Sequence, residues 1–194
     1  MPGLASISSA AQNWRDLRDE RLMTASLRSS LFLLMLFSAG CTNGYDTKSP
    51  AFYDDLAAEG AAVNGEAAAS MISDYRQTNG LNAVELDPTL IRIAEEQVRA
   101  MAKVDKLTHD PGGRGLAERM KSVSFFATRA AENIGAGYHT LAEAFSGWRD
   151  SPSHNKNMLM PGVTKMGIAT AYVPKSKYKV YWALVLAEPD AKTH

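Results

Sequence analysis

The chain has 194 residues with 21 basic and 21 acidic side chains, so its formal net charge at pH 7 is zero. This balance leaves no basic surface of the kind that nucleic acids require, and we expect no nucleic acid partner. Cys41 is the single cysteine, which excludes an internal disulfide, so a hydrophobic core must stabilise the fold. Residues 41–194 are enough for one domain.

The N-terminal segment has the pattern of a secretory signal. Arg28 precedes the apolar run 31–37, which is much shorter than the roughly 20 apolar residues of a transmembrane helix. We interpret residues 1–40 as a signal peptide. Met23 gives this signal a more usual length than Met1 does, so residues 1–22 are a candidate for a mis-assigned start, with a long charged leader as the alternative.

The four residues at 38–41 resemble a bacterial lipobox, in which the cysteine is lipidated and becomes the first mature residue. Ser38 stands where Leu or Val is commoner, and Cys41 follows two small residues. One acyl chain anchors a protein only marginally, so the resemblance implies a multiply acylated Cys41. An unpaired thiol is the alternative. We expect an exported protein on the bacterial envelope; Thr42 favours the outer membrane, facing the periplasm, in a Gram-negative source.

Helical periodicity begins after a stretch of small and polar residues. We interpret residues 41–64 as a lipidated tether to a domain at 65–190. The spacing predicts helices over residues 66–78, from Asp87 onward, over 116–123 and from Thr140 to about Arg149. Asp87 is suited as the N-cap before Pro88, and Thr140 and Glu143 form a capping box. The apolar face predicted for the second helix consists of Leu90, Ile91, Ala94, Val98 and Met101.

Alternating apolar residues predict two strands near the C-terminus, over residues 166–172 and 178–186. Residues 174–177 join them, so we expect a hairpin. Because the predicted helices come first and the strands last, the pattern indicates an α+β layered domain.

Imidazoles, a carboxylate and amides are concentrated around His109, Glu132-Asn133 and His154, in a chain with four histidines. Two neutral imidazoles with a carboxylate or water can hold zinc. A histidine beside a carboxylate can act as a general base. The structural alternatives are a plain His109–Glu132 hydrogen bond, Ser153 as N-cap of a short helix over 154–159, and asparagines that satisfy loop backbone.

The order of these motifs resembles the bacterial branch of the CAP superfamily, whose domain is also called SCP-like. The motifs are Glu132-Asn133-Ile134, Trp148, Ser151-Pro152-Ser153-His154, Asn157, Leu159, Gly167 and, upstream, Asp74-Tyr75-Arg76. The resemblance covers about residues 65 to 187. It implies a three-layer α-β-α sandwich with a small antiparallel sheet, and a central cleft lined by two histidines and two glutamates.

By motif, His109, Glu132 and His154 take three of the four family positions. The fourth, three residues after the helix tryptophan, is Ser151 instead of glutamate, which weakens a metal site. We predict a ligand-binding cleft formed by His109, Glu132, Asn133, Ser151 and His154. His109 and His154 are the candidate ligands for zinc or another divalent metal.

The preferred hypothesis is an envelope lipoprotein whose domain binds a lipid, glycan or peptide in this cleft. The first alternative is a metal-dependent hydrolase of envelope substrates, with His109, Glu132 and His154 as candidate catalytic residues. The second is a non-catalytic adhesion or scaffold module. The sequence leaves enzymatic activity open, though it favours a binding protein, and it does not indicate the oligomeric state.

Overall fold

The computed structural model describes residues 49–191, so the predicted signal peptide and Cys41 lie outside the described residues. The described elements are η1 (Ala51–Tyr53), α2 (Gly65–Thr78), β1 (Glu85–Leu86), α3 (Pro88–Val104), η2 (Pro111–Gly113), α4 (Leu116–Ser122), β2 (Ala127–Ala136), α5 (Leu141–Asp150), α6 (Pro152–Met158), β3 (Lys165–Tyr172) and β4 (Val180–Pro189). Within the described part of the chain, every helix is too short or too polar to cross a membrane.

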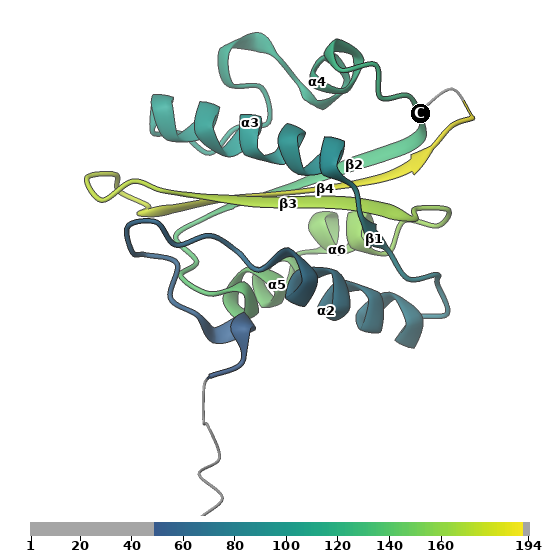
Figure 1. Cartoon of the computed structure of the whole chain (residues 1–194), viewed down its shortest axis with the longest axis horizontal. Coiled ribbons are helices and arrows are strands. Elements are labelled where there is room, and N and C mark those ends of the chain that lie inside the picture. Colours follow the sequence, from purple (N-terminus) through teal and green to yellow (C-terminus); the bar gives the residue numbers. More distant parts are fainter. Residues whose placement is uncertain (1–48, 192–194) are drawn as a thin grey trace, which may run out of the picture. The chain divides into compact units, whose positions relative to one another are not determined.

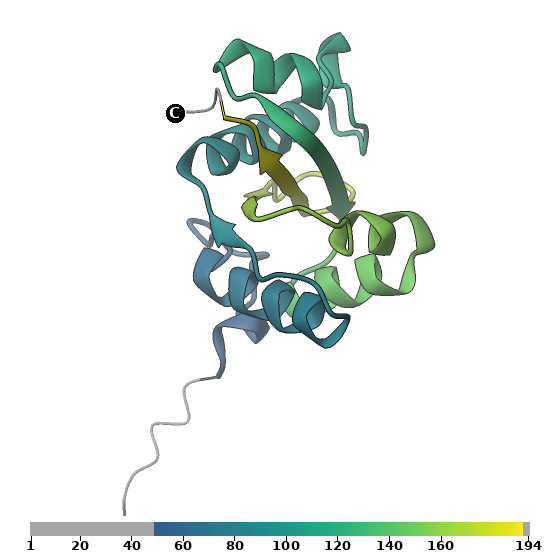
Figure 2. The ribbon, with the colours of Figure 1, turned by 90° about the vertical axis from the view of Figure 1, so that its right-hand side faces the viewer.

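The described elements form three layers around one sheet (Figure 1). The strand order is β1-β3-β4-β2, and β4 pairs antiparallel with both β3 and β2, while β1 pairs parallel with β3. Helices α3 and α4 cover one face of the sheet, and α2, α5 and α6 cover the other (Figures 1 and 2). The predicted α+β sandwich is confirmed; the short parallel pairing of β1 is the only addition to the antiparallel sheet among the described strands.

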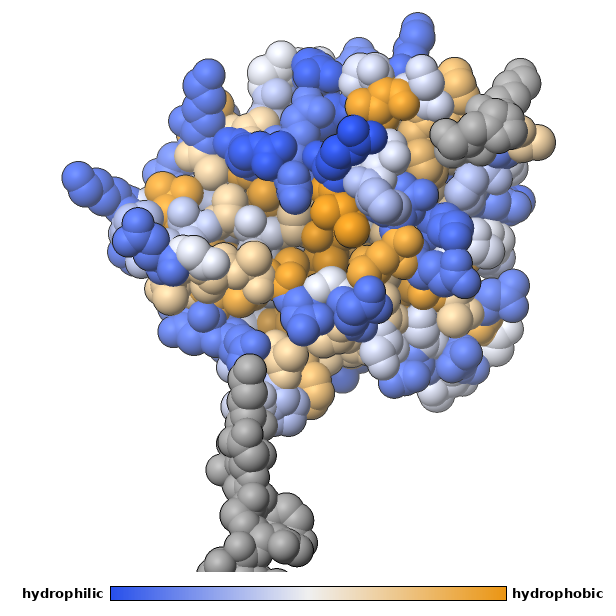
Figure 3. Space-filling model, viewed as in Figure 1, coloured by the Kyte–Doolittle hydropathy of each residue, from blue (hydrophilic) through white to orange (hydrophobic). Residues whose placement is uncertain are grey.

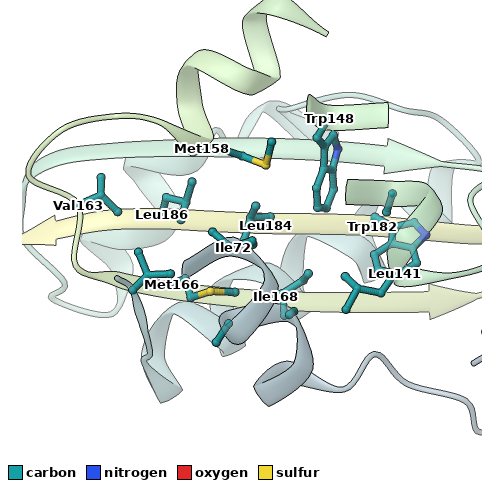
Figure 4. Close-up of a cluster of buried hydrophobic side chains, with 14 of the residues drawn as sticks. Ile72, Leu141, Trp148, Met158, Val163, Met166, Ile168, Trp182, Leu184 and Leu186 are labelled. Atoms are coloured by element: carbon teal, nitrogen blue, oxygen red, sulfur yellow. The ribbon is translucent and has the colours of Figure 1, made fainter. Parts of the chain in front are cut away.

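Strand β4 is buried on both faces and joins two hydrophobic clusters. Trp182, Leu184 and Leu186 point into the cluster with Trp148 and α2, which Figure 4 shows. The alternate residues of β4 pack with α3 on the other face. On the side seen in Figure 3, apolar surface gathers at the level of the sheet, between charged helical layers.

Helix α3 lies unusually close to β3 because residue 167 is glycine. A Cβ atom on Gly167 would lie 2.1 Å from the carbonyl carbon of Leu90. Any larger residue there would push α3 away from the sheet. The segment after α3 holds His109, so this close contact also helps to set the position of the functional site.

The helices and the hairpin agree with the sequence predictions, whereas β2 was missed. Asp87 accepts hydrogen bonds from Thr89 and Leu90, and Thr140 forms the expected capping box with Glu143. The buried face of α3 includes Ile93, not the predicted Ile91.

The predicted start of the domain at residue 65 is too late. Leu56 is 4% exposed and packs in the same cluster as Trp148, and its backbone N–H donates to the carbonyl of His139. The N–H of Val63 donates to Thr170 Oγ1 of β3. The second part of the predicted tether therefore belongs to the domain, while residues 41–48 lie outside the described part.

Candidate functional site

Glu132 lies at the centre of the site with both carboxylate oxygens engaged. It projects from β2 toward α4, where Arg119 NH2 donates to Oε2 at 2.6 Å. His109 Nδ1 lies 2.9 Å from Oε1. The Glu132 and Arg119 side chains are only 3% and 2% exposed. A buried carboxylate needs a partner of this kind, because removal from water opposes its charge.

His109 is the exposed member of this group, with 59% of its side chain accessible. The hydrogen bond to Glu132 raises the pKa of His109 above its usual value, although burial acts in the opposite direction. The preceding residue is held by Gln97 of α3, whose Nε2 donates to the Thr108 carbonyl at 2.7 Å. The ring is thus a fixed base whose protonated form Glu132 stabilises.

His154 lies on α6 in a neutral environment. Its Nδ1 is 2.9 Å from Ser151 Oγ. Burial lowers the pKa of His154, and the charge of nearby His109 lowers it further. The two imidazoles are therefore close enough to influence each other, and their pKa values are shifted in opposite directions.

The prediction that Ser153 caps a helix over 154–159 is wrong. Helix α6 begins at Pro152, and Ser151 takes the N-cap position without a side-chain capping bond. Because proline is favoured in the first turn of a helix, the helix starts at Pro152, two residues earlier than predicted. The Ser151 hydroxyl is instead available to His154.

Asn133 connects β2 to α6 and is fully buried. Its Nδ2 donates to the His154 carbonyl at 3.0 Å, and its Oδ1 accepts from Asn157 Nδ2 at 2.9 Å. Asn157 Nδ2 also contacts the Glu132 carbonyl at 3.3 Å. Asn133, predicted as a cleft residue, therefore holds α6 in place with an amide that is already engaged on both sides.

A buried arginine anchors the other end of α6. Arg76 of α2 donates to four backbone carbonyls, among them Met158 at 2.7 Å and Val163 at 2.9 Å; the others are Asn82 and Met160. Burial lowers the pKa of Arg76. Together, Arg76 and Asn133 fix the helix that carries His154.

The donor set fits a divalent metal poorly. Among residues 49–191, no three His, Cys, Asp or Glu side chains are grouped to hold a metal ion. The Arg119 guanidinium on Glu132 adds a positive charge where a cation would sit. His109 and His154 remain as two imidazoles without a third protein ligand, fewer than the three protein ligands typical of catalytic zinc sites.

The structure brings together all five predicted cleft residues, but it adds two that the sequence reading missed. Arg119 and Gln97 are buried polar residues with one unpaired atom each, Nε and Oε1. Gln97 lies one turn after Ile93 on the apolar face of α3, which was a usable signal, since a polar residue on a buried face needs a partner.

A model of the CAP family, described as the cysteine-rich secretory protein family, matches residues 69–186. The chain belongs to this family. The match covers β1, β2, β3, most of β4 and every residue of the site. The family's description does not fit this member's composition, because the chain has a single cysteine.

Bacterial relatives support the same assignment. The protein YkwD of Bacillus subtilis, described as uncharacterized, is 32% identical over 94 residues, which are 48% of this chain and 37% of YkwD. An extracellular SCP-domain protein of Bacillus anthracis aligns with TM-score 0.56 and 20% identity over 63% of this chain and 39% of its own. The chain thus spans well under half of both relatives.

An outer surface protein of Borrelia burgdorferi shares the fold, which takes up most of that protein's length. It aligns with TM-score 0.55 and 22% identity over 62% of this chain and 89% of its own. At these identities the solved structures show the shared fold alone. The predicted CAP domain, in its bacterial form, is confirmed.

Proposed function

We propose that this CAP domain is the binding module of an exported envelope lipoprotein and that its cleft binds an anionic group. The observation that carries the proposal is the His109–Glu132–Arg119 chain of contacts, with His109 at its exposed end. The lipobox-like segment ending at Cys41 supports the anchoring, and the extracellular and outer surface relatives are consistent with export.

The charges of the three groups favour an anion. Arg119 and Glu132 compensate each other inside the protein, so protonation of His109 gives these three groups one net positive charge, beside the carboxylate of Asp110. Burial lowers the pKa of His154 and so favours its neutral form, in which a ring N–H can donate to a ligand oxygen. A carboxylate on a lipid, glycan or peptide has the charge and acceptor oxygens that this pair of rings accommodates.

The same geometry supports binding better than hydrolysis. Within the described residues, the His154 ring is hydrogen-bonded to Ser151 and to no carboxylate, so nothing orients this dyad as in a serine hydrolase. Both carboxylate oxygens of Glu132 are engaged by Arg119 and His109, so neither is free to act on a substrate. The poor metal donor set gives a metal-dependent hydrolase no further support.

The test follows the two imidazoles of the full-length protein by NMR during titration with N-acetylglycine, glucuronate and decanoate. We expect at least one carboxylate to shift the His109 signals at pH 6, and the response to weaken at pH 8 or in His109→Gln. If none of the three shifts either ring at pH 6, the proposed function is wrong. Mass spectrometry of the native protein tests acylation separately, with Cys41→Ser as control.

A further inference from the structure

Strand β2 is an edge of the sheet, and only part of this edge is covered. In an antiparallel ladder, backbone groups point alternately toward and away from the partner strand. The carbonyl of Ile134 points away from β4 and accepts from Trp148 Nε1 at 3.1 Å. The carbonyl of Glu132 accepts from Asn157 Nδ2 at 3.3 Å. Side chains of α5 and α6 thus cap the second half of the edge.

The first half of the edge lacks such caps. By the same alternation, the N–H and C=O of Ala130 point outward, and within residues 49–191 neither has a hydrogen-bond partner. Thr128 and Arg129 beside it are exposed. Figure 2 looks along the sheet and shows β2 at its outer side, with α4 above it and α6 below. Unpaired groups on an edge strand are a template for another extended chain.

An apolar pocket opens beside these free groups. It has a volume of about 480 Å³, within the range of ligand pockets. Ala127 and Ala130 of β2 form one wall, and the α4 residues Ala117 and Lys121 form part of the other. The remaining lining residues are Leu116, Met120, Phe125 and Phe126. Lys121 is the charged residue of the lining.

We propose that the ligand of this domain is an extended, acidic peptide that pairs with the free edge of β2 at Ala130 and places an apolar side chain in the pocket. This inference rests on the proposed function for the anionic end of the ligand. Ala130 and Glu132 are two residues apart on one strand, a span of about 7 Å. One short peptide therefore reaches from the pocket to His109.

The backbone groups favour a peptide over an acyl chain. An acyl chain fills an apolar pocket but offers no partners for the N–H and C=O of Ala130. An extended peptide supplies both, and the pocket selects an alternate side chain. Lys121 at the pocket and protonated His109 near the other end favour acidic residues in the peptide.

The test measures binding of the fluorescein-labelled peptide Thr-Val-Thr-Phe-Thr-Val-Glu to the full-length protein in lipid nanodiscs, by fluorescence anisotropy at pH 6. Ala117→Trp fills the pocket from an exposed helix position, and Ala58→Trp is the matched control on an exposed alanine outside the pocket. We expect the affinity for the peptide to fall at least tenfold in Ala117→Trp and to stay unchanged in Ala58→Trp.

Two N-methylated peptides test the pairing without altering the protein. One carries methyl groups on the odd amides and the other on the even amides. Since only alternate amides face a paired strand, the affinity of one methylated peptide should fall at least tenfold, while the other should bind as tightly as the parent peptide. Equal binding of both, equal loss of both, or no binding of the parent peptide overturns the inference.

Other occupants give different results. If the protein binds decanoate but not the peptide, and Ala117→Trp abolishes the decanoate binding, the pocket is an acyl site and the proposal is wrong. If the protein dimerises and Ala117→Trp abolishes the dimer, the β2 edge binds a second copy of the chain, and the proposal is again wrong. Peptide binding through β2 that neither His109→Gln nor removal of the peptide's glutamate weakens would support the edge site and contradict the anion-binding function. Carboxylate-induced shifts of the His109 signals without peptide binding would support the anion-binding function and contradict the edge site.

Discussion

The two histidines of the candidate site are held by different means. At one end, His109 rests on a carboxylate that a buried guanidinium compensates. At the other, His154 is held by a hydroxyl, by an amide network through Asn133 and by its helix. The first arrangement favours the charged ring and the second the neutral ring. Two histidines of one site thus acquire different chemistry from their partners.

The largest expected effect comes from removing the charge at the first end. Arg119→Met leaves Glu132 buried without its cation and should cost about 3–5 kcal/mol of unfolding free energy, measured by urea denaturation. Adding Glu132→Gln to Arg119→Met should restore a large part of the loss. A cost below about 1 kcal/mol for the single substitution would mean that the pair is not needed to hold a charged site.

A smaller effect is expected at the neutral end. Asn133→Leu removes the donor to the His154 carbonyl and the acceptor for Asn157, so stability should fall by about 1–3 kcal/mol. Ser153→Ala is the control on the same helix, and we expect a change within about 0.5 kcal/mol because Ser153 is exposed and caps nothing. Equal losses for both substitutions would remove the distinction between Asn133 and the helix surface.

The order of titration tests the contrast directly. NMR titration should show the pKa of His109 above about 6.5 and that of His154 below it. The two rings titrating in the opposite order would contradict the assignment of the charged and neutral ends. His109→Gln should also raise the apparent pKa of His154, since it removes a neighbouring positive charge.

The smallest effect is the pH dependence of stability. Because the folded-state pKa of His109 is raised, its contribution is complete below the unfolded value of about 6.5 and disappears as pH rises through the folded pKa. The ring is more than half exposed, so solvent screening limits this contribution to less than about 1 kcal/mol. Urea midpoints of wild type and His109→Gln should therefore diverge at about pH 5.5 and converge at about pH 8.5.

Local signals in the sequence predicted the helices well. Asp87 and Thr140 begin their helices through contacts within three residues, which a sequence displays directly. Strand β2 was not predicted, because its small residues show no alternation and its pairing depends on β4, about fifty positions away. Pairing with β4, rather than the strand propensity of its own residues, stabilises β2.

The sequence offered the candidate residues but gave no indication of the charge balance around them. His109, Glu132 and His154 were found through motif order, and the structure places them together. Arg119 was missed because an arginine in a short helix reads as a surface residue, and only tertiary contacts show that it is buried. Asn133 was assigned to the ligand, whereas its hydrogen bonds show that it orients α6.

The central position of β4 has a consequence for how the protein is made. Every layer packs on this strand, yet it comes after all the other described elements in the chain. The ribosome releases the helices and β2 before their shared partner exists, and such long-range pairing is slow to form. The nascent chain therefore cannot complete its core until its last strand emerges from the ribosome.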